Sequence, residues 1–145
     1  MDVQEVRKLD AYLKHLFGNA RMRVVPQGKD EAEVFVGEER VGGITVDDED
    51  EERSYNFEMK IALGEAAGIK NLKTLEAYLQ RKFDNDKVRV VARPRKTDSA
   101  EVNVGDEYIG VLFFDEKERG TCYFEMAILE LDLDDLAGRS SVSAR

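Results

Sequence analysis

The chain has 145 residues, of which 37 % are charged and 42 % hydrophobic, and its formal net charge is −9. This length suits one ordinary domain or two very small ones, and no apolar run is long enough to predict a membrane-spanning helix. A single cysteine excludes an intrachain disulfide, and the charged N-terminus lacks the apolar core of a signal peptide. The sequence therefore predicts a cytoplasmic protein.

The first half is predicted to form one helix followed by three strands. An apolar stripe at helical spacing predicts an amphipathic helix that ends near Gly18; its members are Val6, Leu9, Leu13, Leu16 and Phe17. Alternating apolar residues then predict half-buried strands, with a tight hairpin at Gly37. The clearest strand has an apolar residue at every second position: Tyr55, Phe57, Met59, Ile61 and Leu63.

The second half repeats this order after a linker around Gly64–Gly68. Its helical stripe is formed by Leu72, Leu75, Leu79 and Phe83, and its last strand by Cys122, Phe124, Met126 and Ile128. Beyond Leu136 the chain turns to Ser, Ala and Arg, so we expect residues 137–145 to be a disordered tail.

Short segments recur between the halves. Leu9–Leu13 reads LDAYL and Leu75–Leu79 reads LEAYL, while the triplet Phe57–Met59 returns unchanged as Phe124–Met126. A period this long predicts a duplicated small domain rather than a solenoid. We therefore expect an α+β fold built from two αβββ repeats, residues 1–66 and 67–136, each with one helix covering a three-stranded antiparallel meander. The predicted core comprises Leu9, Leu13, Phe57, Met59, Leu75, Leu79, Phe124 and Met126.

The duplication tests candidate catalytic residues, because shared chemistry should survive in both copies. His15, the only histidine, corresponds to Arg81 and is interpreted as a solvated helix residue. Cys122 corresponds to Tyr55 and is interpreted as a core residue. Neither has a counterpart that could complete a nucleophile and base pair, so we expect no enzymatic activity.

The acidic residues are not expected to bind a metal or a cofactor. The run Asp47–Glu52 lacks the glycine and spaced ligands of a calcium loop, and its counterpart Asp115–Arg119 has mixed charge, so a solvated loop is expected. Carboxylates that occur in both copies are expected to form cross-strand salt bridges with Arg23 and Arg89. They are Glu33, Glu101, Glu58 and Glu125.

One basic segment departs from the overall negative charge. Residues 1–66 carry 9 basic and 16 acidic side chains, a net −7, whereas residues 67–145 carry 13 and 15, a net −2. The segment could meet phosphates, but no aromatic residues are interleaved with it in the sequence, and pairing with the protein's own acids is favoured. Its members are Arg89, Arg93, Arg95 and Lys96, with Arg81, Lys82 and Lys87 nearby.

A two-sided apolar run marks a candidate interface. Leu112, Phe113 and Phe114 are consecutive, whereas the first half has Ile44, Thr45 and Val46 in register. Only one face of a strand can pack under its own helix, so Phe113 needs another cover. The candidates are the other repeat, which we favour, a second chain joined through a free sheet edge, or an unidentified protein.

Several segments of the second half carry a family resemblance: Leu75–Leu79, Arg93–Val102, Gly105–Leu112 and Phe124–Leu129. On these, residues from about 72 to 135 resemble a small uncharacterised alphaproteobacterial family, one of the domains of unknown function. The first half looks like a divergent version, with Gly43 in place of Val111. The resemblance implies a bacterial protein that joins in one chain what single-copy relatives build as a dimer, and it implies no activity.

These observations lead to a ranked prediction. The leading reading is a non-enzymatic protein-interaction module with an unidentified protein partner, homodimerisation being a further option. A nucleic-acid-binding protein that uses the basic segment is the alternative from another class, disfavoured by the net charge. The order of helices and strands is also similar to type III secretion chaperones, which gives a protein-binding fold as a third reading.

Overall fold

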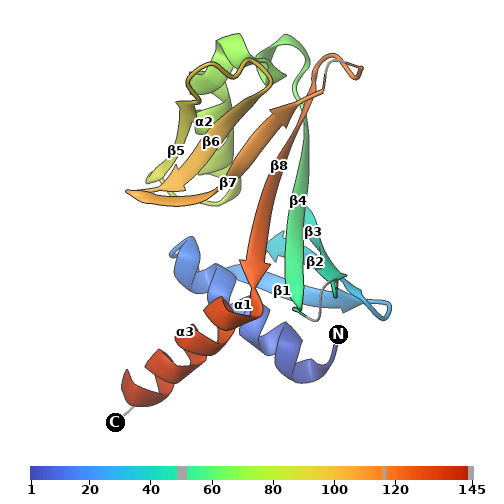
Figure 1. Ribbon diagram of the computed structural model, residues 1–145, viewed down its shortest axis with the longest axis vertical. Helices are drawn as coiled ribbons and strands as arrows, with labels where there is room; N and C mark the ends of the chain where they lie inside the picture. The colour runs from blue at the N-terminus through green and yellow to red at the C-terminus, as the bar shows by residue number, and fades with distance from the viewer. Residues whose placement is uncertain (49–51, 116, 144–145) are drawn as a thin grey trace. The chain divides into compact units, whose positions relative to one another are not determined.

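The computed structural model describes residues 1–48, 52–115 and 117–143. Three α-helices, eight strands and two short 3-10 helices follow one another along this part of the chain (Figure 1). In order they are α1 Val3–Leu16, β1 Met22–Gln27, β2 Glu31–Val36, β3 Glu39–Asp47, β4 Ser54–Ala62, η2 Gly64–Ala67, η3 Ile69–Asn71, α2 Leu72–Lys82, β5 Val88–Ala92, β6 Ser99–Val104, β7 Glu107–Phe114, β8 Thr121–Leu129 and α3 Glu130–Ser143.

The strands form one antiparallel sheet in the order β1-β2-β3-β4-β8-β7-β6-β5. The predicted α+β class and duplication are therefore confirmed, but each repeat contributes four strands rather than the predicted three. The extra strand is short and lies at the edge of the sheet, where β1 includes Pro26 and β5 stops before Pro94. Proline reads as a loop residue in sequence, yet an edge strand tolerates its missing N–H.

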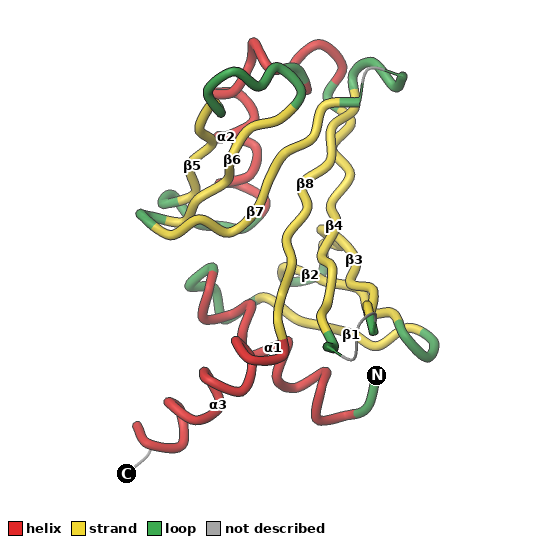
Figure 2. The backbone as a smooth tube through the Cα atoms, viewed as in Figure 1, coloured by secondary structure: helices red, strands yellow, loops and turns green. Residues whose placement is uncertain are grey.

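The two repeats share a strand register, which confirms the predicted alignment. Val24 pairs with Val34 in the first repeat, and Val90 pairs with Val102 in the second. Both hairpins also carry an irregularity at the same place, between Val34 and Phe35 and between Val102 and Asn103. Figure 2 shows β5, β6 and β7 as neighbouring strands.

The predicted core residues are all buried. The helix residues Leu9, Leu13, Leu75 and Leu79 are 0 % exposed, and Phe57, Met59, Phe124 and Met126 are 0–3 % exposed. Phe83 at the end of α2 meets Phe124 edge to face, with ring centroids 6.1 Å apart and planes at 77°. Helix α2 therefore covers one face of the second repeat's strands and leaves the opposite face without a helix of that repeat.

Both outer edges of the sheet are capped by helix side chains. The Val24 N–H in β1 donates to Asp10 Oδ2 at 3.0 Å, and the Val90 N–H in β5 donates to Glu76 Oε2 at 2.9 Å. Gln80 Nε2 additionally donates to the Val88 carbonyl at 2.9 Å. These outward backbone groups are the ones that an added strand would need, so dimerisation through a free edge, which the sequence suggested, is opposed at these positions.

Helix α3 was not predicted. It includes residues 137–143 of the expected disordered tail, and Leu133, near its start, is 2 % exposed. Lys8 of α1 bonds Asp134 at 2.8 Å, so the start of α3 packs on α1. The helix was missed because the contacts that anchor its start, at residues 133 and 134, involve α1 at the other end of the chain.

The chain divides into two compact units whose boundaries differ from those of the sequence repeats. The first unit comprises residues 1–57 and 127–145, and the second comprises residues 58–126. Strands β4 and β8 each contribute residues to both units. Among the described residues, no helix combines the length and apolar character needed to cross a membrane.

Candidate functional site

In the described part of the second unit, one face of the sheet has no helix over it, and we call this the open face. Side chains alternate across a strand, so residues between the buried positions of β5 to β8 point to this face. One row across the strands is Val91, Glu101, Val111 and Glu125, and another is Ser99, Phe113 and Tyr123. A third row is Arg89, Asn103 and Tyr108.

Apolar side chains on the open face are partly exposed. Tyr108 is 57 %, Val91 43 % and Phe113 40 % exposed, and Val111 and Tyr123 are half-buried. An exposed apolar group of this kind, bordered by charges, is typical of an interaction surface. The described residues leave Phe113 partly exposed, so they do not bury the side chain that was expected to need a partner.

The corresponding face of the first unit is occupied by polar contacts. The guanidinium of Arg23 lies 5.0 Å from the centroid of the Phe35 ring. Arg40 Nε donates to Glu33 Oε1 at 3.1 Å across neighbouring strands. Side chains of neighbouring strands therefore interact with one another across this face of the first unit.

Four equivalent positions account for the difference between the two faces. Each is polar or glycine in the first repeat and apolar or aromatic in the second, and the strand pairing around the first three is the same in both repeats. The exchanges are Arg40 to Tyr108, Gly43 to Val111, Thr45 to Phe113 and Asn56 to Tyr123. One exchange runs the other way, from Phe35 to Asn103, and leaves the Asn103 Oδ1 buried without a hydrogen bond in the described part of the chain.

The basic segment predicted from the sequence lies at the β5 border of the open face. Arg89 Nη1 donates to the carbonyls of Asp86 at 2.7 Å and Val88 at 3.2 Å. Arg93 Nη1 donates to Ser99 Oγ at 3.0 Å. Arg95, with a φ of 64°, and Lys96 are exposed in the loop that follows.

Two of the nearby basic side chains do not join this group. Arg81 and Lys82 are on α2, which covers the other face of the strands, and both lie over the Tyr78 ring, at 5.7 Å and 5.3 Å from its centroid. In contrast, Tyr108 shares a row with Arg89. Tyr108 therefore lies on the same face as Arg89, two strands away, although no aromatic residue is interleaved with the basic segment in the sequence.

The predicted salt bridges of the duplicated carboxylates are only partly present. Glu33 pairs with Arg40 instead of Arg23, which bonds the Gly37 carbonyl. In the second unit, burial and the negative charge of Glu58 raise the pKa of Glu125 above its usual range. Among the described residues, neither Glu58 nor Glu125 has a cationic partner, so the β8 side of the open face carries negative charge.

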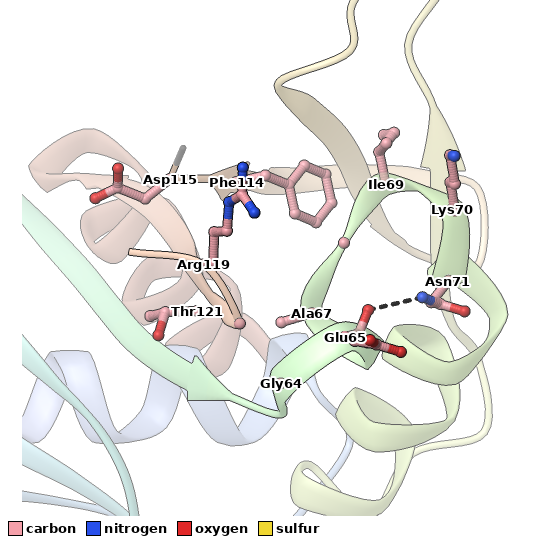
Figure 3. Close-up of a pocket in the computed structure, with 12 residues that line it drawn as sticks. Gly64, Glu65, Ala67, Ile69, Lys70, Asn71, Phe114, Asp115, Arg119 and Thr121 are labelled. Atoms are coloured by element: carbon pink, nitrogen blue, oxygen red, sulfur yellow. Dashed lines mark hydrogen bonds between the residues drawn. The ribbon is translucent and has the colours of Figure 1, made fainter. Parts of the chain in front are cut away.

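A second candidate is a shallow hollow between the linker and the β7–β8 turn (Figure 3). Its volume is about 680 Å³, and it is lined by residues 64, 65, 67–71, 114, 115 and 119–121, among them Ile69, Phe114 and Arg119. The linker is tied there because the N–H groups of Leu63 and Gly64 both donate to the Gly120 carbonyl at 3.1 Å. Its rim mixes Lys70 and Arg119 with Glu65 and Asp115, so the charges favour no one class of ligand.

The lone cysteine and histidine have the places that the sequence predicted. Cys122 is 0 % exposed, and burial raises the pKa of its thiol to about 12, which keeps it protonated and unreactive. His15 is exposed on α1. The acidic run is described only in part: Asp48 accepts two hydrogen bonds from Arg53, whereas residues 49–51 lie outside the described residues.

A buried tyrosine links helix α1 to strand β4 in the first unit. The Tyr55 hydroxyl donates to Glu5 Oε2 at 2.5 Å, and Arg53 Nε donates to the same oxygen at 2.6 Å. Burial, followed by the hydrogen bond to the Glu5 carboxylate, raises the pKa of Tyr55 to about 12. Burial acts to raise the pKa of Glu5, but its hydrogen bonds from Tyr55, Arg53 and the Asp2 N–H outweigh this and leave it below its usual range.

Alkaline pH is therefore expected to weaken the fold through Tyr55. A pKa raised in the folded state means that the folded chain holds the proton more tightly, so this stabilisation is complete below pH about 10 and is lost between about 10 and 12. Urea unfolding at several pH values should show a shallower loss over this window for Tyr55→Phe than for the wild type. Equal slopes would contradict the assignment.

The fold and the open face define a class: a tandemly duplicated α+β protein with one polar and one apolar sheet face. The chain belongs to the family described as Protein of unknown function (DUF3126), whose model matches residues 5–63 and again residues 71–132. No curated protein and no solved structure matches the chain.

Proposed function

We propose that the protein is a non-enzymatic protein-interaction module and that the open face of the second unit binds its partner. The observation that carries the proposal is that four equivalent positions are polar or glycine in the first repeat and apolar or aromatic in the second. Because both repeats keep their strand register and their buried residues, packing under the helices does not require these exchanges. A binding surface on one repeat accounts for them.

Burying the apolar side chains of the open face would release enough free energy to contribute to binding. An aromatic side chain presents about 200 Å², and Phe113 is 40 % exposed, so covering it removes roughly 80 Å² of surface from water. At about 25 cal/mol per Å² this is worth roughly 2 kcal/mol for the one ring. Val91, Tyr108 and Tyr123 add to it.

Nucleic-acid binding is the second candidate, and one observation favours it. Tyr108, Phe113 and Tyr123 lie on a sheet face bordered by Arg89 and Arg93, and bases stack on such exposed rings. However, Glu101 and Glu125 occupy the same face, and the net charge of −9 repels phosphates. These charges make a protein partner the better-supported proposal.

Site-specific photo-crosslinking separates the two candidates. A photoreactive amino acid replaces Phe113 in the full-length chain, and the matched control carries it at Thr45, the equivalent position of the first repeat. After irradiation in living cells, position 113 is expected to form a protein adduct and position 45 only background. A nucleic-acid adduct at position 113 would support the second candidate, and equal background at both positions would contradict both.

A further inference from the structure

We propose that the partner of the open face is a second copy of this chain, bound face to face about a two-fold axis parallel to the strands. This rests on the proposed function, in which the open face binds protein. The inference adds the identity of the partner and the symmetry of the contact.

The distribution of charge points to a self-complementary surface, which a two-fold contact requires. Arg89 and Arg93 lie on the β5 side of the open face, Glu125 and Glu58 lie on the β8 and β4 side, and Glu101 lies on β6 between them. An axis parallel to the strands and between β6 and β7 lays β5 of one copy over β8 of the other. Opposite charges then meet on both sides of the axis.

Other symmetric arrangements are less favourable. An in-plane axis perpendicular to the strands would place β5 over β5 and bring Arg89 and Arg93 near their own copies. Contact through the β5 edge is opposed because the Val90 N–H and the Val88 carbonyl are already bonded to Glu76 and Gln80. The proposed axis avoids both conflicts.

Residues near the axis are also complementary. The axis places β7 of one copy over β6 of the other. Within one chain Phe113 pairs with the small residue Ser99. In the dimer, Phe113 of one copy therefore lies over Ser99 of the other. Tyr108 likewise lies over the row of Asn103.

The size of the face predicts weak association. Four strands at about 4.8 Å spacing and about five residues at 3.4 Å each give roughly 300 Å² of sheet per copy. Stable interfaces bury about 800 Å² per partner. We therefore expect a weak dimer.

Sedimentation equilibrium of the purified full-length chain, from about 1 to 200 µM at physiological salt, tests the inference. The wild type is expected to dimerise, and Phe113→Ser to weaken dimerisation at least tenfold while its thermal melt shows that the variant still folds. Thr45→Ser, at the equivalent position of the first repeat, should not alter it. A wild type that is monomeric at 200 µM would overturn the inference.

Charge reversal tests the symmetry independently of Phe113. One chain carries Arg89→Glu and Arg93→Glu, and the other carries Glu58→Lys and Glu125→Lys. Each chain alone is expected to be monomeric, whereas an equimolar mixture should form a heterodimer, because one open face is then acidic and the other basic. Absence of the heterodimer, with both chains folded, would contradict this arrangement. A monomeric wild type that still crosslinks a different protein through position 113 would overturn the inference and leave the proposed function standing.

Discussion

Replacing Phe124 by Ala is expected to lower the free energy of unfolding by about 3–5 kcal/mol. The ring is 0 % exposed and contacts Phe83 edge to face at 6.1 Å, so its removal leaves a cavity between α2 and β8. Urea denaturation at neutral pH, followed by far-ultraviolet circular dichroism, measures the loss.

The matched control is Phe113→Ala, which removes a ring of the same size from the open face of the neighbouring strand. Since Phe113 is 40 % exposed, the monomer should lose much less stability than with Phe124→Ala. Similar losses for the two variants would show that the buried and open faces of the second unit are wrongly assigned.

The second large effect is expected at Gly110 in β7. A Cβ atom there would lie 2.4 Å from the Glu125 carbonyl oxygen and 2.7 Å from Phe124 Cε1. Because the first of these atoms belongs to the backbone of the neighbouring strand, β8 must shift to admit even a methyl group. We expect Gly110→Ala to cost about 3 kcal/mol, at the upper end of the usual range for overpacking.

Gly43→Ala provides the control for this substitution. Its Cβ would lie 3.2 Å from Arg40 Nη2, the end of a flexible side chain that can move aside. The loss of stability in urea should therefore be small. A Gly110→Ala chain as stable as Gly43→Ala would mean that β7 and β8 do not approach as closely as described.

The core could be predicted from the sequence because its signal is local. Alternation in Tyr55–Ile61 and in Cys122–Ile128 determines which face of each strand is buried, and the stripes of α1 and α2 do the same for the helices. The repeated triplets add the alignment of the two halves. None of these inferences requires knowledge of distant contacts.

The missed elements depend on contacts that no local pattern encodes. Strand β1 includes Pro26 and β5 stops shortly before Pro94, and pairing with β2 and β6 stabilises both strands. Helix α3 has a composition typical of a tail, yet Leu133 is buried and Asp134 bonds Lys8. Tertiary contacts outweigh local preference in both cases.

The candidate site was predicted in part. The position of Phe113 on the open face could be predicted from the two-sided apolar run. A strand that is buried on one face needs apolar residues only at alternate positions, and Phe113 lies between them. The gathering of Tyr108 with Arg89 could not be predicted, since it depends on the irregularity between Val102 and Asn103 that sets the pairing of Tyr108. The salt bridges assigned to Arg23 and Arg89 failed for the same reason, because side-chain partners depend on the exact strand register.

The most direct test of the account is hydroxyl-radical footprinting of the full-length chain in living cells and in dilute purified solution. If the open face binds protein, oxidation of Tyr108, Phe113 and Tyr123 should be several-fold slower in cells, relative to Phe35 of the first unit in the same molecules. The dilute chain should show these rings reacting as their exposure predicts. Equal relative rates in cells and in dilute solution would show that the face is uncovered in both and would contradict the account.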